Sequence, residues 1–314
     1  MKRFGGILAL SLAVALSAAG ARLSQAETAD QSAPNCARGE FRVVLDVGHT
    51  AESPGAKSAR GVDEYAFNLR LARVIEQALR DAGFGKTVLM VSDGPGKRSM
   101  YERVARANAL EANLLLSIHH DSVPKSFIEK WEYDGKPEIF SDRFKGHSLF
   151  VSNDNADPKD SLMFAAMLGR QLKARGLQYT AHYTEAFMGR WRRDLLDTDA
   201  GVYRYDTLFV LKKTRMPAAL LEAGSIVNRD EELLLASPER QQLISAAVVD
   251  AIEAFCAAQA GKPAVQIAHA RPRAIARAMT RAMTKTAHLK RRHSARRTAE
   301  ATPAAVERSN LDMH

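Results

Sequence analysis

The chain has 314 residues, of which 46% are hydrophobic, so it can bury one large core or two smaller ones. Its formal net charge is +9, but residues 262–314 alone hold 12 Lys and Arg against three Asp and Glu. Residues 27–261 hold 30 basic and 33 acidic residues, which excludes a basic surface over the whole protein.

The first 26 residues have the features of a secretory signal peptide. Two basic residues precede an apolar run over residues 7–19, and residues 24–26, Ser-Gln-Ala, have the small-x-small form of a cleavage site. The run is shorter than the about 20 residues that a membrane-spanning helix needs. We therefore predict secretion across the inner membrane into the periplasm, with a mature chain that begins near Glu27 and a short lead-in over residues 27–40.

The predicted domain lies between this lead-in and the basic tail, and strands alternate with helices along it. Apolar runs predict strands at Val43–Val47, Thr87–Val91, Leu114–Ile118, Ser148–Ser152, Leu208–Leu211 and Ala218–Leu221. Three- and four-residue apolar spacing predicts helices from Asp63 to Gly83, Ser99–Ala112, Ser161–Arg175 and Pro238–Phe255. This alternation predicts an α/β fold, a mainly parallel sheet of about six strands with helices on both faces, in one domain over residues 41–260.

Residues 261–314 are rich in Ala, Thr, Arg and Lys and contain no Phe, Trp or Tyr. This composition is typical of a solvated, disordered tail. Its basic charge would attract anionic wall polymers or a membrane surface, and the export signal argues against nucleic acid as a partner. Apolar spacing within Ile275–Lys290 predicts at most a weak amphipathic helix there.

The two cysteines lie at opposite ends of the predicted domain. Cys36 precedes the first strand, and Cys256 ends the last helical pattern. In an oxidising compartment a disulfide between them would close nearly the whole domain into one loop, and two free buried thiols are the alternative. Neither cysteine has the neighbours expected of a metal ligand or a nucleophile.

Four polar residues converge on one predicted edge of the sheet. His49 and the pair His119-His120 follow strands, Glu64 opens a helix, and Glu222 follows the last strand. Two histidines and a carboxylate are a known ligand set for catalytic zinc, and a further carboxylate can act as general base. Polar residues are common at strand ends, so spacing alone leaves a metal site and ordinary turn residues as equal alternatives.

Short motifs along the chain resemble one enzyme family closely. They run in the family's order from about Phe41 to Phe255 and cover essentially the whole predicted domain. The matching residues are Asp46-Val47-Gly48-His49, Glu64 with Asn68-Leu69, Arg103 and Ala107-Asn108, Ser117-Ile118-His119, Pro217 to Glu222, Asn228 and Glu231. In this pattern the chain resembles the zinc-dependent N-acetylmuramoyl-L-alanine amidases of the type 3 family.

This resemblance implies one zinc ion per chain, held by His49, Glu64 and His119, with Glu222 as the catalytic carboxylate. The implied reaction, in cell separation or wall remodelling, is hydrolysis of the peptidoglycan amide between N-acetylmuramic acid and the L-alanine of the stem peptide. Two alternatives stay open: another zinc-dependent wall peptidase or deacetylase, and a non-catalytic wall-binding protein.

The chain departs from the family's pattern after the second histidine, where His120-Asp121 replaces Ala-Asn. We expect His119 to be the ligand, because it aligns with the Ser-Ile-His motif and because neighbours along a strand face opposite sides. His120 then binds substrate, packs behind the ligands or is solvated. Gly224-Ser225 also replaces the family's Gly-Phe, which removes an aromatic ring from the site floor.

Two stretches within residues 123–200 are candidates for a regulatory insertion. Val123–Lys145 is polar without a clear period, and Ala181–Asp197 has three apolar residues at four-residue spacing. Some cell-division amidases of this family carry a helix here that covers the zinc until an activator protein displaces it. By resemblance, one stretch could be such a plug, with Glu185 or Glu129 reaching the metal; a wall of the substrate groove is the equal alternative.

Overall fold

The computed structural model describes residues 36–260. The predicted signal peptide, residues 27–35 of the lead-in and the basic tail at 261–314, with its amphipathic helix, lie outside the described residues. Export, cleavage and the role of the tail therefore stay predictions.

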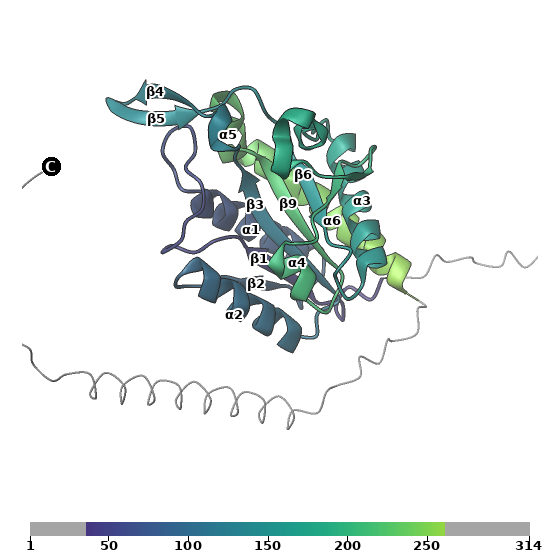
Figure 1. The fold of residues 1–314 in the computed structure, drawn as a ribbon. Helices are drawn as coiled ribbons and strands as arrows, with labels where there is room; N and C mark the ends of the chain where they lie inside the picture. The colour runs from purple at the N-terminus through teal and green to yellow at the C-terminus, as the bar shows by residue number, and fades with distance from the viewer. Residues whose placement is uncertain (1–35, 261–314) are drawn as a thin grey trace, which may run out of the picture. The chain divides into compact units, whose positions relative to one another are not determined.

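A seven-stranded sheet forms the centre of the domain, in the order β2-β1-β3-β9-β6-β8-β7 (Figure 1). The first four of these strands are parallel, β6 is antiparallel to β9, β8 is parallel to β6, and β7 is antiparallel to β8. The strands are β1 (Val43–Val47), β2 (Val88–Met90), β3 (Leu114–Asp121), β6 (Ser148–Val151), β7 (Leu195–Asp197), β8 (Val202–Arg204) and β9 (Ala218–Ser225). The predicted mainly parallel α/β fold is confirmed.

Helices cover both faces of this sheet, and alternate strand residues divide the core between them. Val43, Leu45 and Val47 pack with α1, α3 and α6, whereas Val44 packs with α2 and α4. The helices are α1 (Glu64–Asp81), α2 (Gly96–Ala109), α3 (Pro158–Ala174), α4 (Phe209–Lys213), α5 (Arg229–Ala236) and α6 (Pro238–Gln259). Because β1 is buried on both faces, its sequence is a continuous apolar run broken only by Asp46.

Three parts of the predicted element order are wrong or incomplete. Leu208–Leu211 is not a strand: residues 209–213 form α4, which buries Val210 and Leu211 against the sheet. An apolar run this short has no period that separates a strand from a helix. The short strands β7 and β8 and the helix α5 were not predicted, because runs of three residues and a polar first turn carry little apolar pattern.

The stretch Val123–Lys145 contains a hairpin that stands apart from the main sheet (Figure 1). Its strands are β4 (Glu129–Tyr133) and β5 (Lys136–Phe140), and a short 3₁₀ helix, Lys125–Phe127, precedes them. The Trp131 indole anchors the hairpin, since its Nε1 donates a hydrogen bond to the Ala59 carbonyl at 2.8 Å and the guanidinium groups of Arg60 and Arg229 lie over its ring.

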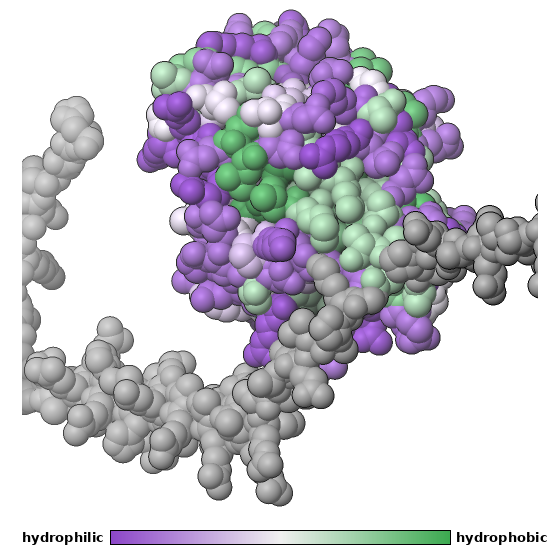
Figure 2. Space-filling model, turned by 90° about the vertical axis from the view of Figure 1, so that its right-hand side faces the viewer, coloured by the Kyte–Doolittle hydropathy of each residue, from purple (hydrophilic) through white to green (hydrophobic). Residues whose placement is uncertain are grey.

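Helix α6 is the one helix among the described residues that is long and apolar enough to cross a membrane. Half of its most apolar window is buried within the domain, where its core side chains pack with α1 and α3. Apolar residues also gather on the right-hand side of the domain in Figure 1, where α3 and the end of α6 lie, and hydrophilic residues surround them (Figure 2). Half of the apolar window of α6 thus serves the core.

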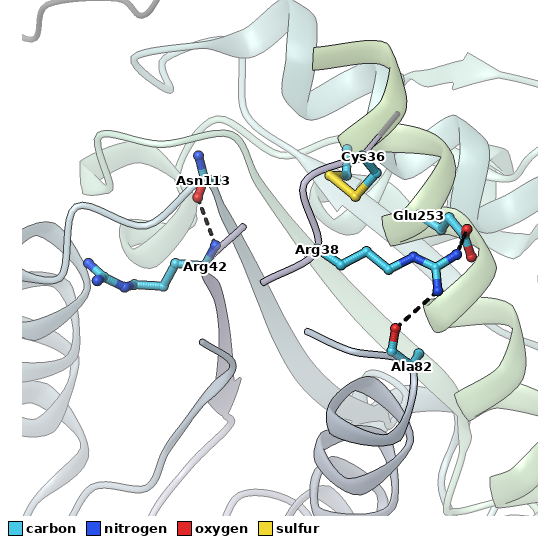
Figure 3. Close-up of a disulfide and its surroundings, with 7 residues drawn as sticks. Cys36, Arg38, Arg42, Ala82, Asn113 and Glu253 are labelled. Atoms are coloured by element: carbon cyan, nitrogen blue, oxygen red, sulfur yellow. Dashed lines mark hydrogen bonds and ion pairs between the residues drawn. A yellow bond between two sulfur atoms is a disulfide. The ribbon is translucent and has the colours of Figure 1, made fainter. Parts of the chain in front are cut away.

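A disulfide joins Cys36 to Cys256 across a sequence separation of 220 residues (Figure 3). It ties the segment before β1 to the last turn of α6. Arg38 strengthens the same junction, because its guanidinium pairs with Glu253 of α6 and donates to the Ala82 carbonyl after α1 at 3.2 Å. Of the two alternatives for Cys36 and Cys256, the structure has the disulfide, which fits an oxidising compartment.

Replacing both cysteines, Cys36→Ser with Cys256→Ser, should lower the free energy of unfolding by about 2–5 kcal/mol, because the loop released in the unfolded chain is long. Urea denaturation of both proteins measures the difference. Dithiothreitol should destabilise the wild type to the same extent and leave the double variant unchanged. Equal stability of the two proteins under oxidising conditions would contradict the prediction.

Candidate metal centre

Three side chains from separate elements meet at the carboxyl edge of the sheet. The donor atoms of His49, Glu64 and His119 all lie within 4.8 Å of one another. His49 follows β1, Glu64 is the first residue of α1, and His119 lies near the end of β3. Because β1 and β3 are adjacent and parallel, both strands deliver their histidine to the same edge.

The Glu64 carboxylate lies between the two imidazole rings. Its Oε2 is 3.0 Å from Nε2 of His49, and its Oε1 is 3.0 Å from Nδ1 of His119. The amide of Asn68 and the backbone N–H of Ala56 also donate to it, at 3.2 and 3.1 Å. Burial raises the pKa of Glu64, but the hydrogen bonds and charges of His119 and His49 outweigh burial and hold that pKa far below its usual value. The site therefore presents an anionic oxygen between two nitrogens.

Glycines make room for these three donors. A Cβ on Gly48 would lie 2.4 Å from the His119 ring, and one on Gly55 would lie 2.4 Å from Oε2 of Glu64. The turn after β1 uses a left-handed backbone at His49 itself, with φ of 67°. A non-glycine residue with this backbone carries strain of about 1 kcal/mol, which is typical of residues fixed at functional sites.

The donor set fits a catalytic zinc ion. Zinc binds imidazole nitrogen and carboxylate oxygen, and its catalytic sites combine three such protein ligands with an open position. Magnesium and calcium take oxygen ligands instead, which two imidazoles do not provide. The close approach of three donors at a cavity wall, with the carboxylate ionised, therefore fits zinc better than these cations.

Glu222 lies beside the three donors on the neighbouring strand. It is paired in register with His119 across the parallel strands β3 and β9, so the two side chains point to the same face. Its Oε2 is buried and has no hydrogen-bond partner among the described residues. Burial, together with the charges of Asp121 and Glu64, raises the pKa of Glu222 well above its usual value. Because its charged form is disfavoured, the Glu222 carboxylate is a strong proton acceptor.

A cavity of about 410 Å³ opens onto these groups. His49, His119 and Glu222 line it on the sheet side. Residues of Ala181–Asp197, one of the two candidate insertions, also line the cavity. They are Tyr183, Met188, Trp191 and Arg193. In this structure the stretch forms two short 3₁₀ helices, His182–Thr184 and Ala186–Trp191, followed by β7. Its residues thus line the cavity.

Neither carboxylate suggested as a plug lies at this site. Glu129 is exposed on the hairpin strand β4, and Glu185 is exposed between the two 3₁₀ helices. Neither residue lines the cavity, and neither belongs to the group of donors. A plug in which one of them reaches the metal position is therefore not the arrangement of this structure.

His120 packs behind the donors. It is buried, its Nδ1 lies 2.8 Å from Oδ1 of Asn68, and its ring contacts that of Phe67 at a centroid distance of 5.4 Å. Burial lowers the pKa of His120 to about 3, which keeps the ring neutral. The solvated alternative is wrong, and alternation along β3 correctly separates His119 from His120.

Two residues of the cavity were not predicted from the sequence. The Tyr183 hydroxyl hydrogen-bonds to both carboxylate oxygens of Asp121, at distances of 2.9 and 2.7 Å. Burial raises the pKa of Asp121 to about 7, against the effect of the Tyr183 hydrogen bond. The position of Asp121 at the end of β3 offered a signal, whereas nothing in the sequence around Tyr183 indicated its contact.

Several motif residues build the scaffold beneath the site. Asp46 of β1 accepts a hydrogen bond from Ser117 at 2.7 Å and lies 3.4 Å from the Arg103 guanidinium, which also donates to the Val47 carbonyl. The Asn228 side chain caps α5, and the Glu231 carboxylate accepts from the backbone N–H of Ser225 at the end of β9. These contacts fix the strand ends that carry the donors.

Known proteins resemble this chain in sequence. The family model described as N-acetylmuramoyl-L-alanine amidase matches residues 43–254. The amidase AmiA of Escherichia coli is 25% identical over 230 residues, which cover 69% of this chain and 76% of AmiA.

Two solved structures share the fold. The amidase Ami1 of Mycobacterium smegmatis superimposes with a TM-score of 0.54 at 22% identity and covers 72% of this chain and 100% of its own. The catalytic domain of CwlV, an amidase of Bacillus (Paenibacillus) polymyxa, gives a TM-score of 0.50 at 26% identity, over 68% of this chain and 97% of its own. With the family model matching about two thirds of its length, the chain belongs to the N-acetylmuramoyl-L-alanine amidase family.

Proposed function

We propose that this amidase hydrolyses the bond between N-acetylmuramic acid and L-alanine with one zinc ion held by His49, Glu64 and His119 and with Glu222 as general base. The observation that carries the proposal is the meeting of three zinc-type donors and one uncompensated carboxyl group at a single cavity. The family membership supplies the amide bond that is cut.

The residues of the chain divide the work between binding and proton transfer. When bound, zinc would lower the pKa of water and polarise the amide carbonyl. Glu222 accepts the proton of the attacking water and passes it to the nitrogen of the departing L-alanine. Its raised pKa suits both steps, because the carboxylate gains a proton easily and the carboxyl group returns it to an amine. The scaffold around Glu64 and Asn68 keeps the donors oriented.

The predicted signal peptide, the basic tail and the disulfide suggest where the protein acts. We propose that the protein is exported by residues 1–26 and acts on the wall in the periplasm, where the Cys36–Cys256 disulfide is stable. The basic tail at 261–314 would hold it near anionic wall or membrane surfaces. A role in cell separation or wall remodelling is the expected setting.

Product analysis separates this activity from that of a zinc-dependent wall peptidase or deacetylase. An amidase releases intact stem peptides that carry a free L-alanine amine. A peptidase shortens the stem peptides, and a deacetylase releases acetate. Digestion of purified sacculi followed by mass spectrometry of the soluble products distinguishes the three.

Glu222→Gln should lower hydrolysis of sacculi by about 10²- to 10⁴-fold, because the amide cannot accept the proton of the attacking water. Zinc content, measured by elemental analysis, should stay at one ion per chain. Glu185→Gln is the matched control, since Glu185 is an exposed carboxylate of the same wall that does not line the cavity. Full turnover by Glu222→Gln would remove Glu222 from the role of general base.

Gly48→Ala should weaken zinc binding by about 10- to 100-fold, because the new Cβ would displace the His119 ring by steric overlap. Competition with a chromophoric chelator measures the affinity. Gly85→Ala is the control, because a Cβ at Gly85 meets no atom within 4 Å. Unchanged affinity in Gly48→Ala would argue against His119 as a ligand.

Deleting Thr184–Arg193 tests whether the stretch is a wall or a plug. The ends left by the deletion are close, since the Arg193 N–H donates to the Tyr183 carbonyl at 2.8 Å. If the stretch is a wall of the substrate groove, the deletion should lower activity on sacculi by about tenfold or more and leave the zinc content unchanged. Increased activity of the purified variant would instead support a plug and an activator protein that displaces it. Circular dichroism of the variant controls for misfolding.

A further inference from the structure

The cavity continues into an open groove of about 500 Å³. Cavity and groove share three residues, Trp191, Arg193 and Tyr205. The groove is lined by residues 190–194 at the end of the second 3₁₀ helix and by residues 204–207 after β8. A ligand held at the metal centre can therefore extend into this groove, which we call the arginine groove.

The arginine groove has an excess of positive charge. Four arginines and two aspartates line it. Arg204 forms ion pairs with both aspartates, at 2.5 Å to Asp194 and 3.5 Å to Asp206. The other arginines, at positions 190, 192 and 193, form no ion pair with any carboxylate in the described part of the chain. Arg190 and Arg192 are thus exposed cations beside the cavity without a negative partner among the described residues, and Arg193 is a half-buried one.

Two of these arginines are held in place by aromatic rings. The guanidinium of Arg193 lies 3.8 Å from the ring centre of Tyr205, and that of Arg190 lies 4.9 Å from the ring centre of Trp191. Nη1 of Arg193 also donates to the carbonyls of Arg190 and Arg192, at 3.1 and 2.9 Å. Ordering an arginine side chain before a ligand arrives reduces the entropy lost on binding.

The two halves of the substrate differ in charge. The glycan on one side of the scissile amide carries neutral hydroxyl and acetamido groups. The peptide on the other side continues from L-alanine into glutamate and ends in a free carboxylate. Guanidinium groups bind carboxylates through paired, charge-assisted hydrogen bonds, which no group of the neutral glycan can offer.

We infer that the arginine groove binds the carboxylates of the stem peptide and so directs the peptide half of the substrate away from the metal centre along residues 190–194. This inference rests on the proposed amidase function for the identity of the ligand. It assigns Arg190 and Arg192 to substrate binding, with Arg193 at the junction of cavity and groove.

A pair of small ligands that differ in one charge tests the inference. Muramoyl-L-alanyl-D-glutamate carries a free α-carboxylate, and muramoyl-L-alanyl-D-isoglutamine carries an amide at the same position. Binding is measured by calorimetry on the zinc-loaded full mature chain with Glu222→Gln, which prevents turnover. We expect the acid to bind about three- to tenfold more tightly than the amide, because an exposed ion pair contributes modestly.

The double variant Arg190→Gln with Arg192→Gln should remove this preference for the acid. The amide keeps only the γ-carboxylate of its isoglutamine, so its affinity should fall less than that of the acid. Arg73→Gln with Arg215→Gln is the charge-matched control, because both residues are exposed arginines outside the cavity and groove. In enzymes with Glu222 intact, the same loss should appear as a higher KM for the acid at an unchanged kcat.

Equal affinity of the Glu222→Gln protein for the acid and the amide would overturn the inference, as would an acid preference that survives in Arg190→Gln with Arg192→Gln. Because binding is measured without turnover, either result leaves the amidase proposal standing. Conversely, intact sacculi after treatment with the zinc-loaded wild type would contradict the amidase proposal, while the comparison of the two ligands would still test the groove.

Discussion

The site depends on keeping one carboxylate, that of Glu64, ionised while it is almost completely buried. An isolated buried carboxylate would take up a proton, because burial disfavours its charge. Here two imidazole nitrogens, an amide and a backbone N–H surround it, and these contacts hold its pKa low. That cluster requires β1, β3 and the start of α1 to meet within a few ångströms, and it requires glycine at positions 48 and 55, where a side chain would collide with the donors.

Parallel strands provide this convergence with little freedom. The register of β3 and β9 pairs His119 with Glu222. The two neighbouring strands therefore place a donor and the proposed base on the same face of the sheet. The alternation of the strand turns the next residue, His120, to the opposite face, where Asn68 and Phe67 receive it. Below the strand ends, Asp46, Ser117 and Arg103 form a buried polar network that fixes β1 against β3 and α2. The chemistry and the scaffold are therefore set by the same hydrogen-bonded sheet.

The opposite side of the cavity is built differently. Residues 181–194 have little regular structure beyond two short 3₁₀ helices. Tyr183 is fixed there by Asp121, and Arg193 by the ring of Tyr205. A wall of this kind can differ between relatives without disturbing the donors, because it adds no strand to the parallel part of the sheet. In the proposed function the metal centre fixes which bond is cut, and the arginine groove selects the peptide attached to that bond.

The sequence by itself determined the mainly parallel sheet and the opposite facing of His119 and His120. Strong apolar runs and strand alternation act over a few neighbouring residues, so they can be read from the chain directly. The sequence did not determine α4, since a run such as Leu208–Leu211 suits a strand or a helix equally, nor the hairpin at Glu129–Phe140. Only the tertiary structure showed that residues of the stretch 181–197 line the cavity, that Tyr183 meets Asp121 and that three arginines gather beside the cavity. Those contacts join segments about 60 residues apart or lie in irregular backbone, where no periodic pattern records which side chain will face which.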